Sequence, residues 1–169
     1  MTGYSVRVVK AANGAQVGAL RSATAAATSL KVTGLLNGTA VRFQVRATNS
    51  VGTSGFSARS NAVTPATVPA RPVIRLASSG AAGGTVNAVA RWAPPAVNGG
   101  AAVTGYVVTA IRLNANGTVA SLTRSTVRPA GLRSLTMTLR PGSYRFVVQA
   151  RNRMGMSSAS VRSNLVRAR

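Results

Sequence analysis

Hydrophobic and polar residues alternate with a period of two in several stretches of the chain. In residues 144–151, one set of alternate positions is apolar: Tyr144, Phe146, Val148 and Ala150. Residues 41–47 have the same pattern, with apolar residues at Val41, Phe43, Val45 and Ala47. Because successive side chains of a strand point to opposite faces, this period predicts antiparallel strands with one face on a core. No stretch has the 3.6-residue period of an amphipathic helix, so we expect an all-β fold.

Turn-forming residues separate these apolar runs. Asn37-Gly38 and Asn116-Gly117 are pairs that favour the tight turns of β-hairpins. Asn98-Gly99-Gly100 and Pro141-Gly142 mark further turns. We therefore expect short strands joined by short loops, with hairpins at the two Asn-Gly pairs.

The chain repeats itself at a spacing of about 102 residues. The matching segments follow in the same order, Thr2-Gly3-Tyr4 with Thr104-Gly105-Tyr106, Arg42-Phe43 with Arg145-Phe146, Asn49 with Asn152, and Arg59-Ser60-Asn61 with Arg162-Ser163-Asn164. This is the signature of a tandem array. Residues 63–72 contain three prolines, which suit a short, stiff linker. We predict two domains, residues 1–65 and residues 66–169.

Charge then changes the picture. The 169 residues include 19 arginines and 2 lysines but no Asp, Glu or His, so the formal net charge is +21. About a quarter of the residues of an average chain are charged, and close to half of those are carboxylates. Three explanations are compatible with their absence: selection for a polyanionic partner, a composition bias of the source, or a sequence assigned from a density map in which carboxylates are poorly visible.

The missing residue types also remove most catalytic chemistry. General acid–base catalysis, Ser-His-Asp triads and carboxylate or imidazole metal sites all need residues that this chain lacks. The chain has no cysteine for a disulfide, a zinc site or a redox pair. We therefore expect no enzyme activity, no catalytic residue, no metal and no cofactor. No apolar run approaches the roughly 20 residues of a membrane span, and residues 1–10 do not read as a signal peptide.

The second repeat resembles the fibronectin type III family, particularly the tandem modules of bacterial or phage surface proteins. The residues that carry the resemblance are, in order, Trp92-Ala93-Pro94-Pro95, Asn98-Gly99-Gly100, Thr104-Gly105-Tyr106, the runs 135–139 and 144–152, Gly155 and Ser163-Asn164. The resemblance implies tandem antiparallel β-sandwiches with immunoglobulin-like architecture. It further implies that Trp92 packs between two sheets and that the Tyr144 hydroxyl bonds to the backbone near Leu139, as in a tyrosine corner.

The first repeat begins at the position of the third strand of this family. The sequence has no counterpart of the first two strands or of Trp92, and Val41 stands where the corner tyrosine would be. Without the corner hydrogen bond we expect the core of this domain still to close, whereas the absence of two strands would expose core residues and an unpaired sheet edge. The missing strands belong either to a longer protein of which this is a fragment or to another chain that donates them by strand addition.

Four arginines are the candidate binding residues: Arg42, Arg46, Arg145 and Arg151. They would lie on the outer face of the same strand in both repeats, where guanidinium groups can bind phosphate or sulfate. The alternative is that outward strand positions simply require polar residues, and the dispersal of the basic residues along the chain favours it. Rings that could stack on nucleic acid are scarce, since Phe56 is the one aromatic side chain expected to be exposed.

Three functions are compatible with these expectations. The first, implied by the resemblance, is a non-enzymatic structural or adhesive module of a larger extracellular, cell-surface or virion-surface protein, with protein partners or copies of itself in a surface assembly. The second is an arginine-rich protein that binds a polyanion, either nucleic acid or an acidic glycan. The third is an accessory module of a secreted carbohydrate-active enzyme.

Overall fold

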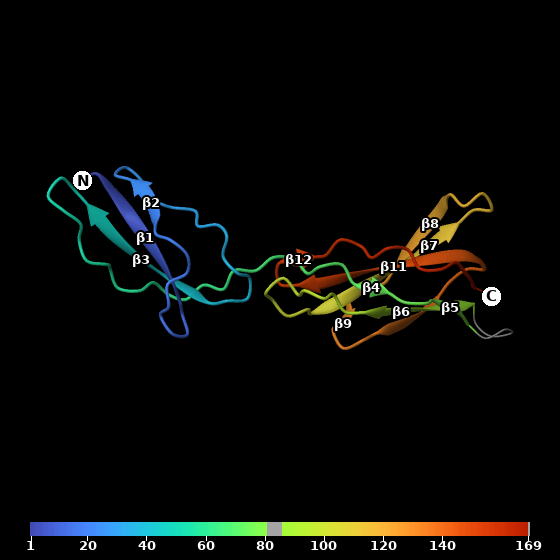
Figure 1. Ribbon diagram of the computed structural model, residues 1–169. Helices are drawn as coiled ribbons and strands as arrows, with labels where there is room; N and C mark the ends of the chain where they lie inside the picture. Colours follow the sequence, from blue (N-terminus) through green and yellow to red (C-terminus); the bar gives the residue numbers. More distant parts are fainter. Residues whose placement is uncertain (81–85, 169) are drawn as a thin grey trace. The chain divides into compact units, whose positions relative to one another are not determined.

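The computed structural model describes residues 1–80 and 86–168, and it divides into two compact units, Met1–Ala66 (unit 1) and Thr67–Arg169 (unit 2). Strands make up the regular structure of both units, and all of the strand pairs are antiparallel (Figure 1). None of the described residues is helical, so this part of the chain has no helix that could cross a membrane. The expectation of an all-β fold is confirmed.

Unit 2 is a sandwich of two antiparallel sheets. One sheet has the order β10-β6-β4, with β5 also on β6; its strands are β4 (Val73–Ile74), β5 (Ser78–Ser79), β6 (Asn87–Ala93) and β10 (Ser134–Thr138). The other has the order β12-β11-β7-β8, with β9 on β7 and β13 on β11; its strands are β7 (Gly105–Leu113), β8 (Val119–Arg124), β9 (Arg128–Pro129), β11 (Gly142–Asn152), β12 (Gly155–Met156) and β13 (Val166–Ala168).

The core of unit 2 lies between these sheets. The apolar face of β11 is buried as its alternation predicts, with at most 2% of each of these side chains exposed: Tyr144, Phe146, Val148 and Ala150. Trp92 of β6 is 3% exposed, and its ring centroid lies 5.4 Å from that of Tyr106 in β7. Each such aromatic side chain stabilises the fold by about 2 kcal/mol or more through burial of its apolar surface. The expected position of Trp92 is confirmed.

The tyrosine corner is present in unit 2. The Tyr144 hydroxyl donates a hydrogen bond to the Arg140 carbonyl at 2.9 Å, one residue from the expected position. In unit 1 Val41 takes this place and is 2% exposed. Its backbone N–H and C=O both bond to Val63, so the chain is held there by a backbone pair instead.

Unit 1 contains a single three-stranded sheet of order β2-β1-β3, formed by β1 (Gly3–Lys10), β2 (Arg21–Thr24) and β3 (Val41–Thr48). β1 and β3 pair over their full lengths, from Gly3↔Thr48 to Lys10↔Val41. β7 and β11 pair in the same way in unit 2, which includes Gly105↔Arg151. Unit 1 therefore lacks the strands that the family places before this pair, as the sequence predicts.

The core of unit 1 is partly covered. Val6, Val8 and Val41 are at most 8% exposed, whereas Val45 is 40% exposed and Phe43 is half-buried, because no second sheet of unit 1 covers that part of β3. The expectation of a hairpin at Asn37-Gly38 is wrong, because β2 and β3 lie on opposite sides of β1. Asn116-Gly117 does join the paired strands β7 and β8, and Gly117 has the positive φ (80°) that such a turn requires.

Candidate functional site

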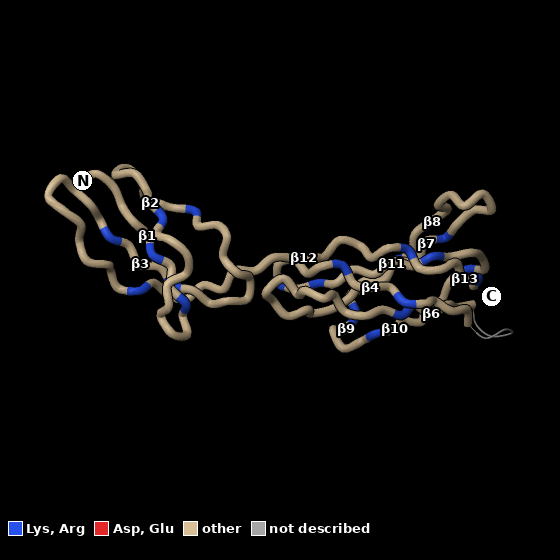
Figure 2. Tube along the Cα trace, in the orientation of Figure 1, with Lys and Arg blue, Asp and Glu red and all other residues tan. Residues whose placement is uncertain are grey.

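Basic residues are spread over the strands and loops of both units, and the sequence has no Asp or Glu to pair with them (Figure 2). The four candidate arginines occupy the outer faces of β3 and β11, opposite the apolar faces described above. Arg42 and Arg46 alternate with Gln44 on β3, and Arg145 and Arg151 are the fourth and the second-last residues of β11. What surrounds each guanidinium group decides what it can bind.

A segment with a serine at every third residue runs beside β3. The backbone N–H groups of Ser54, Ser57 and Ser60 donate to carbonyl groups of β3, and the three hydroxyl groups accept hydrogen bonds from N–H groups of the same strand. Each hydroxyl then donates to the carbonyl of the residue that follows it. The spacing equals the three residues per turn of a polyproline II helix. Through these hydrogen bonds the segment pairs with β3 where an edge strand would.

Unit 2 has the same arrangement beside β11. Ser157, Ser160 and Ser163 are buried and accept hydrogen bonds from the backbone N–H groups of Ala150, Val148 and Phe146 at 2.9–3.0 Å. We call these two segments, residues 54–60 and 157–163, the serine ladders. The sequence contains this three-residue spacing of serine, but it matches neither the two-residue period of a strand nor the 3.6-residue period of a helix.

Arg42 and Arg145 hold the last serine of each ladder. Nη1 of Arg42 donates to the Ser60 carbonyl at 2.8 Å, and Nη1 of Arg145 donates to the Ser163 carbonyl at 2.6 Å. The two arginines therefore make the same contact in both units. This structural contact explains why an arginine occurs at the same position of both repeats. The other nitrogens of each guanidinium group can still bind a further acceptor.

Arg46 belongs to a stack that the sequence did not reveal. Two guanidinium groups lie over the ring of Phe56, with Arg7 3.9 Å and Arg46 4.9 Å from the ring centroid. Phe56 is therefore half-buried, and the expectation that it is exposed is wrong. Arg7 also donates from Nη2 to the Gln44 side chain at 2.8 Å. Cation–π contacts of this kind stabilise by about 0.5–2 kcal/mol.

The stack carries unsatisfied donors. The Nε atoms of Arg7 and Arg46 are buried and have no hydrogen-bond acceptor among the described residues. Arg151 differs from both, since its side chain is exposed at the end of β11. The four candidate arginines, which we call the candidate stripe, therefore do not form one uniform site. Arg42 and Arg145 contact the ladders, Arg46 stacks on Phe56, and Arg151 faces solvent.

The second candidate is the face of the unit 1 sheet on the side opposite the arginines, of which only a part is exposed. We call it the open face; it is formed by Tyr4, Val6, Val8, Phe43 and Val45. Val6 and Val8 are 8% and 1% exposed, and Val45 is 40% exposed. A groove of about 660 Å³ lies on it and is lined by Val6, Phe43 and Val45 from the sheet and by Leu30 and Val32 from the segment before β3. These residues offer apolar contact to a ligand.

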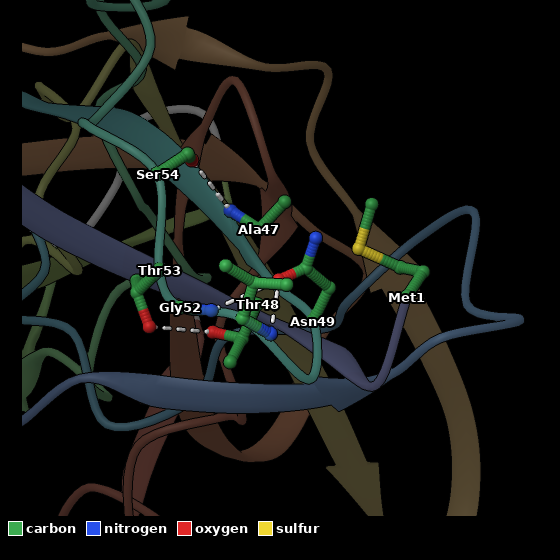
Figure 3. Close-up of a pocket in the computed structure, with 8 residues that line it drawn as sticks. Met1, Ala47, Thr48, Asn49, Gly52, Thr53 and Ser54 are labelled. Carbon is green, nitrogen blue, oxygen red and sulfur yellow. Dashed lines mark hydrogen bonds between the residues drawn. The ribbon is translucent and has the colours of Figure 1, made fainter.

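A turn at one end of unit 1 makes fewer side-chain hydrogen bonds than its counterpart in unit 2. Asn49 accepts hydrogen bonds at Oδ1 from the N–H groups of Val51 and Gly52, beside a hollow of about 420 Å³ (Figure 3). Its counterpart Asn152 is 2% exposed, and Nδ2 of Asn152 donates to the Thr67 and Asn98 carbonyls. Among the described residues Nδ2 of Asn49 has no such acceptor. The two hydrogen bonds that Nδ2 of Asn152 makes in unit 2 therefore have no counterpart in unit 1.

Comparison with known proteins gives one relative and several structures. No protein-family profile matches the chain. A Kelch domain-containing protein of Saccharolobus solfataricus is 38% identical over 137 residues, which cover 79% of this chain. The chain spans only 17% of the length of that protein.

Among solved structures, domains A168–A170 of titin match 96% of this chain and 53% of the titin chain, with a TM-score of 0.56 and 19% sequence identity. The FN1–FN3 domains of chicken CNTN1 match 98% of this chain and 56% of theirs, with a TM-score of 0.47 and 18% identity. The chain therefore has the fold of tandem fibronectin type III and immunoglobulin-like β-sandwiches, the first of which lacks its first two strands.

Proposed function

We propose that the chain is a non-enzymatic structural module of a larger extracellular, cell-surface or virion-surface protein. The observation that supports this most directly is the repetition of one plan: β1 and β3 pair in unit 1 as β7 and β11 do in unit 2, and a serine ladder follows each pair. Repeated sandwiches set the spacing and orientation of neighbouring parts of a protein without any reactive residue. A sequence without Asp, Glu, His or Cys fits such a role.

The connection between the units supports a spacer. On one side of the boundary the Pro65 carbonyl accepts a hydrogen bond from Gly38 N–H at 2.9 Å, within unit 1. On the other side Thr67 N–H donates to the Gly99 carbonyl at 2.8 Å, within unit 2. Few residues are left between these bonds to act as a long flexible tether.

The similarity to a Kelch domain-containing protein supports a larger parent. The matching stretch is 17% of that protein, so the rest of its length lies outside the similarity. We infer that this chain likewise serves as one part of a multidomain protein, in which its partners are protein surfaces or further copies of the module.

Surface proteolysis of intact cells or virions of the source tests the location. Peptides from both units should be released by a protease added outside, before any peptide of a cytoplasmic marker protein appears. Peptides that are recovered only after lysis would contradict the surface location. The structural role would then have to be sought inside the cell.

The uncompensated charge of unit 1 favours a second candidate, the binding of a polyanion such as nucleic acid or an acidic glycan. Arg7 and Arg46 lie on one face with Arg42, and no carboxylate is available in the sequence to neutralise them. Phosphate or sulfate oxygens would bind guanidinium N–H groups at the surface, since the buried Nε atoms of Arg7 and Arg46 are not accessible to a dissolved polyanion. Dense positive charge also attracts polyanions without any specific site.

Two matched variants test this candidate, each with four arginines replaced by glutamine. The test variant changes the candidate stripe, Arg42, Arg46, Arg145 and Arg151. The control changes four exposed arginines elsewhere, Arg71, Arg75, Arg140 and Arg162. Heparin or DNA affinity is measured against salt, where the logarithm of the affinity falls by about 0.9 per phosphate contact per logarithmic unit of salt for B-DNA. A stripe site predicts a larger loss of slope in the test variant, and salt-insensitive or absent binding would contradict the polyanion role.

A further inference from the structure

Asn-Gly pairs occur four times in the chain, at residues 13–14, 37–38, 98–99 and 116–117. Such a pair is chemically labile, because glycine has no side chain to hinder its own backbone nitrogen, which can attack the side-chain amide carbon of the asparagine. The four pairs share this sequence and differ in their contacts. These contacts therefore decide where in the folded chain the reaction is favoured.

Asn116, in the loop between β7 and β8, has the most favourable contacts. Its Oδ1 atom accepts two hydrogen bonds from Thr118, one from the backbone N–H at 3.1 Å and one from the hydroxyl group at 2.7 Å. The first bond folds the side chain over the peptide group of Gly117, as in an Asx turn. Both bonds point at the oxygen that becomes negatively charged when a nucleophile adds to the amide carbon, and donors placed there stabilise that charge.

Asn114 orients the hydroxyl group of Thr118. Nδ2 of Asn114 donates to Oγ1 of Thr118 at 3.0 Å, so the proton of that hydroxyl group is directed toward Asn116. Hydrogen bonds in such a chain polarise one another. The loop is exposed, and no atom beyond the neighbouring residues lies within 4 Å of the point that a Cβ atom at Gly117 would occupy. The reacting atoms are therefore open to water.

The loop after β1 of unit 1 provides a comparison. Oδ1 of Asn13 also accepts the N–H of the residue two positions on, Ala15, at 3.1 Å. In both pairs the glycine N–H donates to a preceding carbonyl, at 2.9 Å in unit 1 and 3.0 Å in unit 2. Ala15, however, has no hydroxyl group, and Nη2 of Arg59 lies 2.6 Å from the Cβ position at Gly14. Asn13 therefore lacks the second donor, and its glycine is partly covered.

The other two pairs are held by contacts with more distant residues. Gly99 is buried, and the carbonyl groups of both residues of its pair accept hydrogen bonds from elsewhere in unit 2. At the fourth pair Gly38 N–H donates to the Pro65 carbonyl at 2.9 Å. No donor among the described residues bonds to Oδ1 of Asn37. Neither pair combines a free loop with two donors on the amide oxygen.

We propose that Asn116 is a site of spontaneous deamidation in the folded protein, and that the Thr118 hydroxyl group promotes the reaction. The backbone nitrogen of Gly117 forms a bond to Cγ of Asn116, the bond from Cγ to Nδ2 breaks, and ammonia leaves with the proton of the glycine amide. Water then opens the resulting succinimide ring and yields aspartate or isoaspartate at position 116. Either product is the first acidic side chain of a sequence that has none. The inference does not depend on the surface role proposed above.

The test incubates the purified chain at mildly alkaline pH, folded and unfolded in urea. Trypsin releases the four pairs in separate peptides, residues 11–21, 32–42, 92–112 and 113–124, and mass spectrometry measures the fraction of each that has changed from amide to acid. Dividing each folded rate by the unfolded rate of the same peptide removes the effect of the neighbouring sequence. The ratio for Asn116 should exceed that for Asn13 about fivefold, the factor that corresponds to one net hydrogen bond, and the ratio for Asn98 should be the smallest.

Two substitutions of Thr118 separate the role of the hydroxyl group from that of the turn. Thr118→Ala removes the hydroxyl donor, keeps the backbone N–H, and should lower the ratio for Asn116 about fivefold. Thr118→Ser keeps a hydroxyl group and should leave the ratio nearly unchanged. A ratio for Asn116 no higher than that for Asn13, or an equal effect of the two substitutions, would overturn the proposal.

Discussion

In this protein, serine hydroxyl groups make hydrogen bonds to backbone groups that would otherwise pair with a neighbouring strand. In each ladder the serine hydroxyl accepts a backbone N–H of the neighbouring strand and donates to the next carbonyl, so that one side chain satisfies two backbone groups. The ladder is thereby hydrogen-bonded to the neighbouring strand at every third residue. Because Ser157, Ser160 and Ser163 are buried, water cannot replace these bonds.

Ser163→Ala should therefore destabilise unit 2 by about 1–3 kcal/mol, because it leaves the buried N–H of Phe146 without an acceptor. The measurement is chemical denaturation followed by the fluorescence of Trp92, which lies in the same core. Ser158→Ala is the matched control, because Ser158 is exposed, and it should change the stability by less than about 0.5 kcal/mol. Equal effects of the two substitutions would show that the hydroxyl bonds contribute nothing.

Tyr106 should make unit 2 sensitive to alkaline pH. Burial raises the pKa of its hydroxyl, and the nearby guanidinium group of Arg133 offsets this in part. In the unfolded chain a tyrosine titrates near pH 10. Above that pH the unfolded state loses its proton more readily than the folded state, so the stability that is fully present below about pH 10 falls as the pH rises toward the folded pKa.

Thermal unfolding midpoints between pH 8 and pH 11.5 test this, with Tyr106→Phe as the comparison. The wild-type chain should lose more stability over this range than the variant. Parallel curves would mean that the ionisation of Tyr106 is not linked to folding.

At the scale of elements, the clearest contrast is between the two asparagines that follow the ladders. Asn164 bonds both backbone groups of Ala77, a residue that is 6% exposed, and so ties the C-terminal segment of unit 2 to its second sheet. Asn61 has the same neighbours in sequence but no second sheet to hold. One repeat therefore serves as the control for the other.

Asn164→Ala should destabilise unit 2 by about 1–3 kcal/mol, because two backbone groups of a buried residue lose their partners. Asn61→Ala should change the stability of the chain by less than about 0.5 kcal/mol. Urea unfolding of the two variants measures both values. A loss at Asn61 as large as that at Asn164 would contradict the view that the amide acts by gripping the second sheet.

The sequence predicts those elements that follow a strand period or a family pattern. The alternation in residues 144–151, Trp92 and the Tyr144 corner are all found where the pattern places them. The contacts of Arg7 and Phe56 could not be predicted, because they join residues that are adjacent only once β1, β3 and the ladder are assembled. The exposure of Val45 could not be predicted from its place in the apolar alternation, because burial depends on a second sheet and the residues of unit 1 form one sheet.

In the whole molecule, both units contain the same central strand pair and serine ladder, but they differ in the number of sheets. Unit 2 has both sheets and buries its core residues, whereas unit 1 has one sheet with an open apolar face. Exposed apolar surface of this kind marks an interaction site in soluble proteins. The basic residues lie on both units (Figure 2).

Hydrogen exchange of backbone amides, read by mass spectrometry, tests this account most directly. Residues 134–138 should be strongly protected, because they are paired with β6, and residues 30–36 should exchange rapidly in the chain alone. Strong protection of residues 30–36 would contradict the account, since these residues would then be paired in a second sheet as β10 is in unit 2.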